Sequence, residues 1–201
     1  MLIELLTRWW MTEDTIPPVK NPLIVAITYG SPRDKLSIGT QRAVEEAAWL
    51  WHTYGGCVAY AMPANSYHGS AADEHRMKFA LLKSLSVRQE RILWGQESMN
   101  SISEAEAVKH LAEQRGEKFD AVIVVCTAIH SRGIRLIWRH YFPTVKVVVV
   151  CLPDFPEIEP GHQIVIQRSR WAWFAANLVR HAAILLLGLE FAKKFSEPAA
   201  D

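Results

Sequence analysis

Short apolar runs rich in β-branched residues constrain the fold of this chain more than any other feature. The clearest runs are Leu23–Ile27, Ala121–Cys126 and Val145–Cys151, in which almost every residue is apolar. A strand with one face in water would alternate apolar and polar residues, whereas a continuous apolar run is typical of a strand covered on both faces, as in parallel sheets. Two weaker runs, Cys57–Met62 and Arg91–Trp94, predict further strands.

In the segments between these runs, apolar residues recur every three or four positions, which predicts helices. Examples are Ala43, Ala47 and Leu50, then Ile134, Ile137 and Tyr141, and a long final helix from about Arg168 to Lys194. Because strand and helix alternate, we predict an α/β chain with a three-layer Rossmann-like fold and a mostly parallel, doubly wound sheet. Residues 1–22 are expected to form a lead helix and a proline-rich linker. Residues 23–201 are expected to form a single domain that includes the long C-terminal helix.

Charge and cysteine usage narrow the class of protein. Lys and Arg number 22 against 21 Asp and Glu, so the net charge of +1 gives no electrostatic reason to expect nucleic acid as a partner. The three cysteines lie in or beside apolar runs and have no zinc-like spacing, which favours buried free thiols in the cytoplasm and assigns no metal. The segment 171–191 is apolar but interrupted by polar residues, so we expect no membrane span.

Tryptophans are concentrated near the two ends of the chain. Trp9 and Trp10 lie in the lead helix, and Trp171 and Trp173 begin the final one. Large aromatic side chains contribute much buried area, so this placement predicts contacts between the termini or between subunits. We expect the apolar C-terminal helix to bury such a subunit contact, which would make the protein a homo-oligomer.

Polar residues gather where predicted strands end and helices begin. In a parallel sheet these points share one edge, where open α/β sheets bind ligands. Glu97 is a candidate general base, metal ligand or ribose acceptor, and a neutral His130 a candidate base or ligand. The residues expected to line a subsite for an anion or cofactor are Gly30, Ser31, Glu74, Asn100, Ser101, Thr127 and Arg132.

Structural roles also account for several of these residues. Ser101 and Glu104 have the S-x-x-E spacing of a capping box, which would start a helix and leave Glu97 unexplained. Gly30 and Ser31 fit a plain turn. A packed histidine at position 130 is an equal alternative to a functional one.

Several of these motifs, in this order, resemble one bacterial family. They are Gly30, Arg42, Glu74 with Met77, the block Glu97–Ser101 and the block Cys126–His130. Over roughly residues 23 to 151 the chain resembles the YdcF, SanA and ElyC family, a domain of unknown function with a Rossmann-like α/β fold. The family has an arginine three residues after the histidine, where this chain has Gly133. It therefore looks like a divergent member in which Arg132 or Arg135 would replace that arginine.

The resemblance implies only a broad function. Members are linked to cell-envelope biogenesis, one is reported to bind S-adenosylmethionine, and the cytosolic YdcF-like branch fits a chain that starts without an anchor. We expect an enzyme that acts on a small phosphate-bearing or nucleotide-like molecule by hydrolysis or group transfer, with its cofactor unassigned. Whether the chain is an enzyme stays open, because a non-catalytic nucleotide or S-adenosylmethionine-binding module and an envelope-associated assembly factor are the alternatives.

Overall fold

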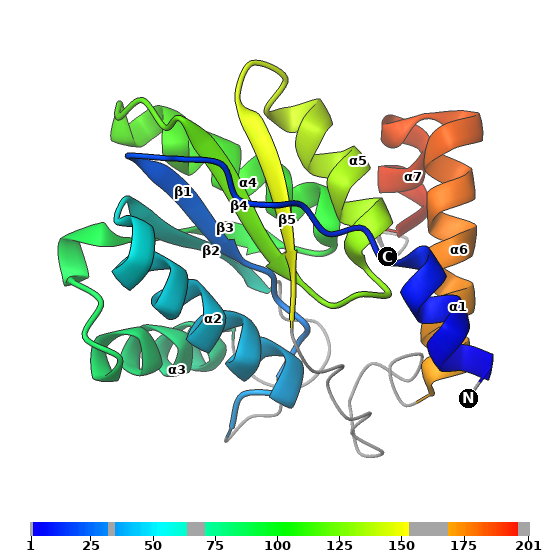
Figure 1. Cartoon of the computed structure of the whole chain (residues 1–201), viewed down its shortest axis with the longest axis horizontal. Coiled ribbons are helices and arrows are strands. Elements are labelled where there is room, and N and C mark those ends of the chain that lie inside the picture. The colour runs from blue at the N-terminus through cyan, green and yellow to red at the C-terminus, as the bar shows by residue number, and fades with distance from the viewer. Residues whose placement is uncertain (1, 32–34, 64–70, 153–168, 197–201) are drawn as a thin grey trace.

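A computed structural model describes residues 2–31, 35–63, 71–152 and 169–196. Its centre is a five-stranded sheet in the order β3-β2-β1-β4-β5, and every pairing between neighbours is parallel (Figure 1). The strands are β1 (Pro22–Ala26), β2 (Cys57–Pro63), β3 (Ile92–Ser98), β4 (Ala121–Cys126) and β5 (Lys146–Cys151). This sheet, with its alternating helices, confirms the predicted Rossmann-like α/β fold.

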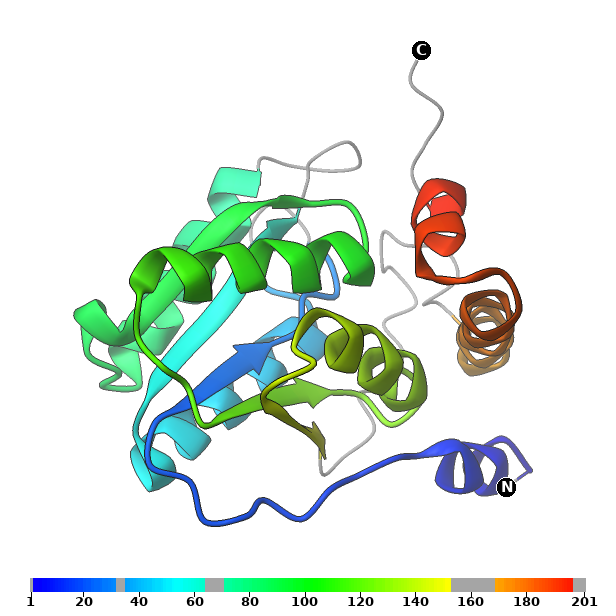
Figure 2. The ribbon, with the colours of Figure 1, turned by 90° about the horizontal axis from the view of Figure 1, so that it is seen from above.

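The helices that connect the strands form a layer on each face of the sheet. Helices α2 (Ile38–Tyr54) and α3 (Ala71–Ser84) cover one face, and α4 (Ser101–Arg115) and α5 (Ser131–Tyr141) cover the other (Figures 1 and 2). Right-handed crossovers require this arrangement, because the chain first steps outward through β2 and β3 and then returns to β4 on the other side of β1. The strand order therefore reverses between β1 and β4, where such folds bind ligands.

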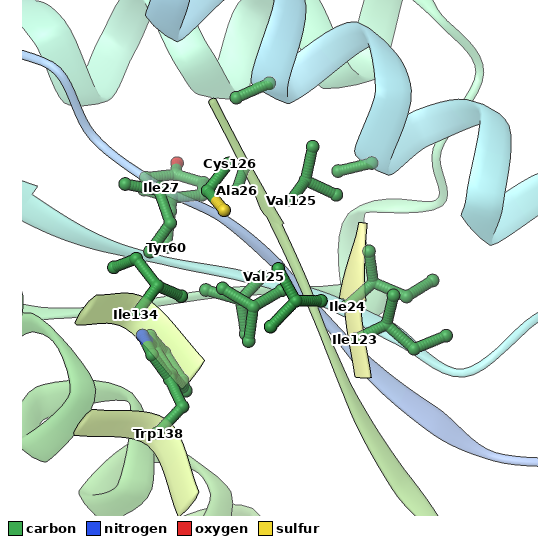
Figure 3. Close-up of a cluster of buried hydrophobic side chains, with 14 of the residues drawn as sticks. Ile24, Val25, Ala26, Ile27, Tyr60, Ile123, Val125, Cys126, Ile134 and Trp138 are labelled. Atoms are coloured by element: carbon green, nitrogen blue, oxygen red, sulfur yellow. The ribbon is translucent and has the colours of Figure 1, made fainter. Parts of the chain in front are cut away.

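The central strands are buried on both faces, as their continuous apolar runs predict. Every residue of β1 and β4 is buried. Figure 3 shows residues of these strands in one core with Ile134 and Trp138 of α5. Cys57, Cys126 and Cys151 are all free and buried, which confirms the prediction from their apolar surroundings.

Two elements differ from the prediction by more than one residue. The single long C-terminal helix is wrong, because the chain forms α6 (Arg170–Leu187) and α7 (Leu189–Ser196). Gly188 separates them with a φ of 86°, a conformation that glycine adopts at little cost. Strand β3 extends four residues beyond the predicted Trp94. None of the described helices is long and apolar enough to cross a membrane. The polar segments 64–69 and 153–163, which the sequence predicts to be loops, lie outside the described residues.

Helix α1 (Leu2–Trp10) is anchored through its last residue. Trp10 is buried, and its Nε1 donates a hydrogen bond to the carbonyl oxygen of Ile129 over 2.9 Å. Its ring meets Phe174 and His181 of α6 edge-on, with centroids 5.7 and 5.1 Å apart. The two ends of the chain thus pack against each other, as Figures 1 and 2 show.

The segment after α1 covers the outer edge of β5. The backbone N–H of Asp14 donates to the Val149 carbonyl over 2.9 Å, and the Asp14 carboxylate accepts from the N–H of Val149 over 3.0 Å. The Glu13 carboxylate accepts from the N–H of Cys151 over 3.3 Å. Because β5 is the last strand of the described sheet, these bonds occupy backbone groups that would otherwise form an open edge.

Gly56 offers a test of how tightly the start of β2 packs on β1. Its φ is +78°, and an added Cβ would lie 2.0 Å from the carbonyl oxygen of Pro22. We expect Gly56→Ala to lower the free energy of unfolding by about 3 kcal/mol or more, because backbone must move. Gly116→Ala is the control, since its φ is +68° and an added Cβ has nothing within 4 Å; it should cost about 1 kcal/mol. If urea denaturation showed the same loss of unfolding free energy for both variants, the close approach of Gly56 to the Pro22 carbonyl would be contradicted.

Candidate functional site

Polar side chains continue the hydrogen bonding of β1 beyond the end of its ladder. The N–H of Ile27 still donates to the carbonyl of Val125 over 3.3 Å. The next N–H, of Thr28, donates to the carboxylate of Glu104 over 2.9 Å. The following one, of Tyr29, donates to a threonine hydroxyl at the start of α2 over 3.1 Å. Buried backbone donors need partners, so this edge of the sheet collects polar groups for structural reasons alone.

The predicted capping box of Ser101 and Glu104 is wrong. The N-cap of α4 is Asn100, whose side-chain oxygen accepts from the N–H groups of Ile102 and Ser103 over 2.9 and 3.0 Å. The Ser103 hydroxyl accepts from the N–H of Asn100 over 3.1 Å and completes the box. The helix therefore starts one residue earlier than the S-x-x-E pattern implies, which leaves the Ser101 and Glu104 side chains for contacts with distant parts of the chain.

Ser101 contacts His130, as a nucleophile contacts a base in a hydrolytic site. The Oγ of Ser101 lies 3.0 Å from the Nε2 of His130, and both residues are buried. The Nη1 of Arg180, from α6, lies 3.4 Å from the same nitrogen. We call Ser101, His130 and Arg180 the edge site. Its members come from the starts of α4 and α5 and from the C-terminal helix.

The surroundings of His130 fix its protonation. Burial, with a smaller contribution from the charge of Arg180, lowers the pKa of His130 to about 3, so the ring is neutral at pH 7. An arginine only donates hydrogen bonds. If Nε2 accepts from Arg180, the ring proton lies on Nδ1, and the single lone pair of Nε2 is shared between the Arg180 N–H and the Ser101 hydroxyl. The Nδ1 atom is buried without a partner among the described residues, so no carboxylate there orients the ring as in a catalytic triad.

A buried charge cluster adjoins the edge site. It consists of Thr28, Glu74, Lys78 and Glu104. Lys78 is fully buried, with its Nζ 2.8 Å from the Glu74 carboxylate and 2.6 Å from the Thr28 hydroxyl. Burial raises the pKa of Glu104 to about 7, although the Thr28 hydrogen bond and Lys78 oppose that change. Glu104 lies one turn after Ser101 on α4, so the two groups share a helix face.

Other predicted residues hold the loops around this edge. The N–H of Thr127 donates to the hydroxyl of Tyr29 over 2.7 Å, which links the segments after β4 and β1. Gly30 follows with a positive φ of 73°. The Ser31 hydroxyl accepts from the N–H of Ser37, the N-cap of α2, over 3.2 Å. These contacts bring Gly30, Ser31 and Thr127 to the predicted edge.

Glu97 and Arg132 are not joined to the edge site by any hydrogen bond or ion pair in the described part of the chain. Glu97 lies near the end of β3 and is exposed, and its side chain makes no hydrogen bond or ion pair with another described residue. The guanidinium of Arg132 donates to the carbonyls of Trp10 and Trp9 over 2.7 and 3.0 Å, at the C-terminal end of α1. Arg135 forms an ion pair of 2.6 Å with the N-terminal segment. Both arginines thus help to dock the N-terminal residues.

Sequence reasoning missed Lys78 and Arg180. Lys78 had a usable signal, because it lies four residues after Glu74 and four before the buried Leu82, on one stripe of α3. A lysine on a buried stripe needs a partner, and the glutamate one turn earlier supplies it. Arg180 had no such signal, since its approach to His130 depends on how α6 docks.

Comparisons with known proteins give no relative: no family model matches this sequence, and no curated protein does. The resemblance to the YdcF, SanA and ElyC family stays a prediction from the residues quoted above. Within the described ranges, no group of three or more His, Cys, Asp or Glu side chains is arranged to hold a metal ion.

Glu104 and His130 contribute oppositely to the pH dependence of stability. Between pH 4.5 and about 7 the folded chain keeps a proton on Glu104 that the unfolded chain has lost. The free energy of unfolding then falls as pH rises, by about 3 kcal/mol in total. Between about pH 3 and 6.5 the unfolded chain binds a proton at His130 that the folded chain does not. That contribution makes stability rise with pH, by about 5 kcal/mol.

Single substitutions should separate these two effects. With Glu104→Gln, which keeps an oxygen for the Thr28 N–H, the free energy of unfolding should rise more steeply between pH 4.5 and 6.5 than in the wild type. With His130→Gln it should fall over that range. Urea denaturation at half-unit pH steps measures both slopes. Glu90→Gln alters an exposed carboxylate and should keep the wild-type slope; a wild-type slope for Glu104→Gln would refute the assignment.

Proposed function

We propose that this protein is an enzyme that acts on a small phosphate-bearing or nucleotide-like molecule, by hydrolysis or group transfer, at the edge site. The observation that carries the proposal is the 3.0 Å contact between Ser101 Oγ and the Nε2 of a neutral His130. Such a pair can remove the proton from an attacking hydroxyl. The pair lies at the carboxyl edge of a doubly wound sheet, where this fold class binds its ligands.

The surroundings of the pair favour an anionic substrate. Arg180 is half-buried and has no acidic partner among the described residues. Ser101 is the first residue of α4 and His130 precedes α5, so both lie at helix N-termini, whose partial positive charge attracts anions. The amide nitrogen of Asn100 is buried and unpartnered in the described part of the chain, which leaves one more donor at this edge.

The proposed reaction has two steps, the formation of a phosphoserine and its hydrolysis, and His130 carries one proton in each step. Ser101 Oγ forms a bond to phosphorus and passes its proton to His130 Nε2, and the bond from phosphorus to the leaving oxygen breaks as that oxygen takes the proton. Water then attacks the phosphoserine, His130 accepts the proton of that water and returns it to Oγ, and phosphate leaves. Arg180 stabilises charge on the phosphoryl oxygens. The bound anion offsets the charge of Arg180 and so raises the pKa of His130.

Most of the remaining predicted residues would act around this proposed site, whereas the Arg132 guanidinium is already bound to the end of α1. Glu97, exposed at the end of β3, would contact the ligand as a base or ribose acceptor. Gly30, Ser31 and Thr127 would supply the loop around the anion. Glu74 would act indirectly, because it is already paired with Lys78.

A second candidate function is a non-catalytic module that binds a nucleotide or S-adenosylmethionine. The observation that favours it is the Nδ1 atom of His130, which has no carboxylate partner among the described residues. A pKa of about 3 also makes His130 a weak base in the absence of ligand. Under this alternative the same donors bind an anionic group that is not altered.

We also propose a cytoplasmic location and a relationship to the YdcF, SanA and ElyC family. Three buried free thiols fit a reducing compartment, and the Rossmann-like strand order fits the fold that the resemblance implies. The alternative of an envelope-associated assembly factor would act through the surface rather than the edge site.

A ligand screen with site variants tests the enzyme proposal. The probes are inorganic phosphate, AMP and S-adenosylmethionine in thermal unfolding, and a chromogenic phosphate monoester for turnover. A ligand at a hundred times its Kd should add about 2.7 kcal/mol of stability. Ser101→Ala and His130→Gln should keep phosphate binding and lose turnover by about 10²-fold or more. Arg180→Gln should weaken phosphate binding by about tenfold or more.

Arg139→Gln is the matched control, because Arg139 is exposed on α5. It should leave binding and turnover at wild-type values. Binding without turnover that depends on Arg180 would favour the non-catalytic module. A complete lack of stabilisation and of turnover across the panel would refute both.

A further inference from the structure

The outward face of α6 carries an unbroken apolar stripe. Its members are Trp171, Ala175, Leu178, Ala182 and Leu185, all exposed. Val179 and Leu186 flank the stripe and are 69% and 81% exposed. No charged residue interrupts this surface. A continuous exposed patch of several large apolar side chains is typical of a surface that contacts a partner.

The opposite face of α6 is already used within the chain. Trp173, Phe174, Asn177 and Ile184 are buried, and Arg180 reaches His130. Helix α6 thus has large apolar side chains on its inner and its outer face. A helix with this pattern is normally covered on both faces. Among the described residues, the protein body covers only one of these two sides.

The spacing of the stripe specifies a helix as its partner. Successive members lie four, three, four and three residues apart, which is the repeat that two helices packed along their lengths require. Side-chain size alternates with the same repeat, because the alanines at 175 and 182 separate the larger residues. A flat lipid surface would gain little from the alanines, and the stripe offers no lysine or arginine to lipid headgroups.

A second copy running antiparallel fits this alternation. If the two-fold axis passes beside residue 180, Leu178 lies opposite the partner's Ala182, and Leu185 lies opposite the partner's Ala175. Each leucine then fills the space that an alanine leaves, whereas a parallel pair would set leucine against leucine and alanine against alanine. We infer that the protein is a two-fold symmetric homodimer through the α6 stripe, independently of the chemistry at the edge site.

Helix α1 carries a second exposed apolar set next to α6. It packs against α6, and its exposed Leu2, Leu5 and Trp9 are spaced three and four residues apart. An 18-residue helix is about 27 Å long. One helix pair of that length buries less than a standard interface, so a stable dimer would need further area, and the exposed apolar residues of α1 are candidates for it.

Light scattering after size-exclusion chromatography, over a range of concentrations of the full chain, tests the dimer. The wild type should be dimeric, and Leu178→Glu should weaken association by at least about a hundredfold, because it buries a carboxylate at the seam. Leu187→Glu is the matched control: Leu187 is 57% exposed on the same helix but lies off the stripe. It should remain dimeric. Circular dichroism and thermal unfolding check that each variant is folded.

Single cysteines test the orientation even if the glutamate variant does not fold. The native cysteines are buried, so they add little background. A short bifunctional maleimide should crosslink two copies of Leu178→Cys, and should not crosslink Trp171→Cys or Leu187→Cys. Crosslinking at Trp171→Cys instead would mean a parallel pair and would overturn the antiparallel arrangement. A monomeric wild type, or one that binds anionic vesicles through the stripe as a monomer, would overturn the dimer.

Discussion

The hydrogen bond from the Thr28 N–H to the carboxylate of Glu104 governs the arrangement at the carboxyl edge of the sheet. It satisfies the first backbone donor after β1 that the neighbouring strands do not reach. A buried N–H without a partner would cost about 1–3 kcal/mol. A buried carboxylate is itself costly, and Lys78 and Glu74 form the ion pair that accompanies it. The continuation of one strand thus explains a charge cluster that, by composition alone, resembles a site for catalysis.

The same requirement positions the edge site. Glu104 fixes the face that α4 turns towards the end of β1, and Ser101, one turn earlier, then points to the start of α5, where it meets His130. The ring of Trp173 lies edge-on to that of His130, with centroids 5.5 Å apart, and helps to exclude water from it. Removing water is what lowers the pKa of His130. The neutral histidine is therefore a product of packing by the C-terminal helix as well as by the sheet.

The fold was predictable because its signals are local. Continuous β-branched runs separated by amphipathic helices predict buried parallel strands, and the structure contains them. The meeting of polar side chains at the carboxyl edge of the sheet was also predictable, since the ends of parallel strands share one edge. The contacts between those side chains were not predictable. The S-x-x-E pattern predicts a cap, but Asn100 and Ser103 form the cap one residue earlier. Arg180 reaches His130 only through tertiary docking, and no local pattern encodes that approach.

The position of Arg180 depends on apolar packing more than on its own polar contact. Its distance of 3.4 Å from His130 Nε2 is long for a hydrogen bond, and no ion pair within the described ranges holds it. The helix that carries it is held by Phe174 and Trp173, and by the ring of Trp10 from the other end of the chain. Any partner that covers the outer face of α6 would favour the same placement, because binding to the folded arrangement stabilises it. The proposed binding of an anion at the edge site would therefore be linked to surfaces outside the Rossmann-like core.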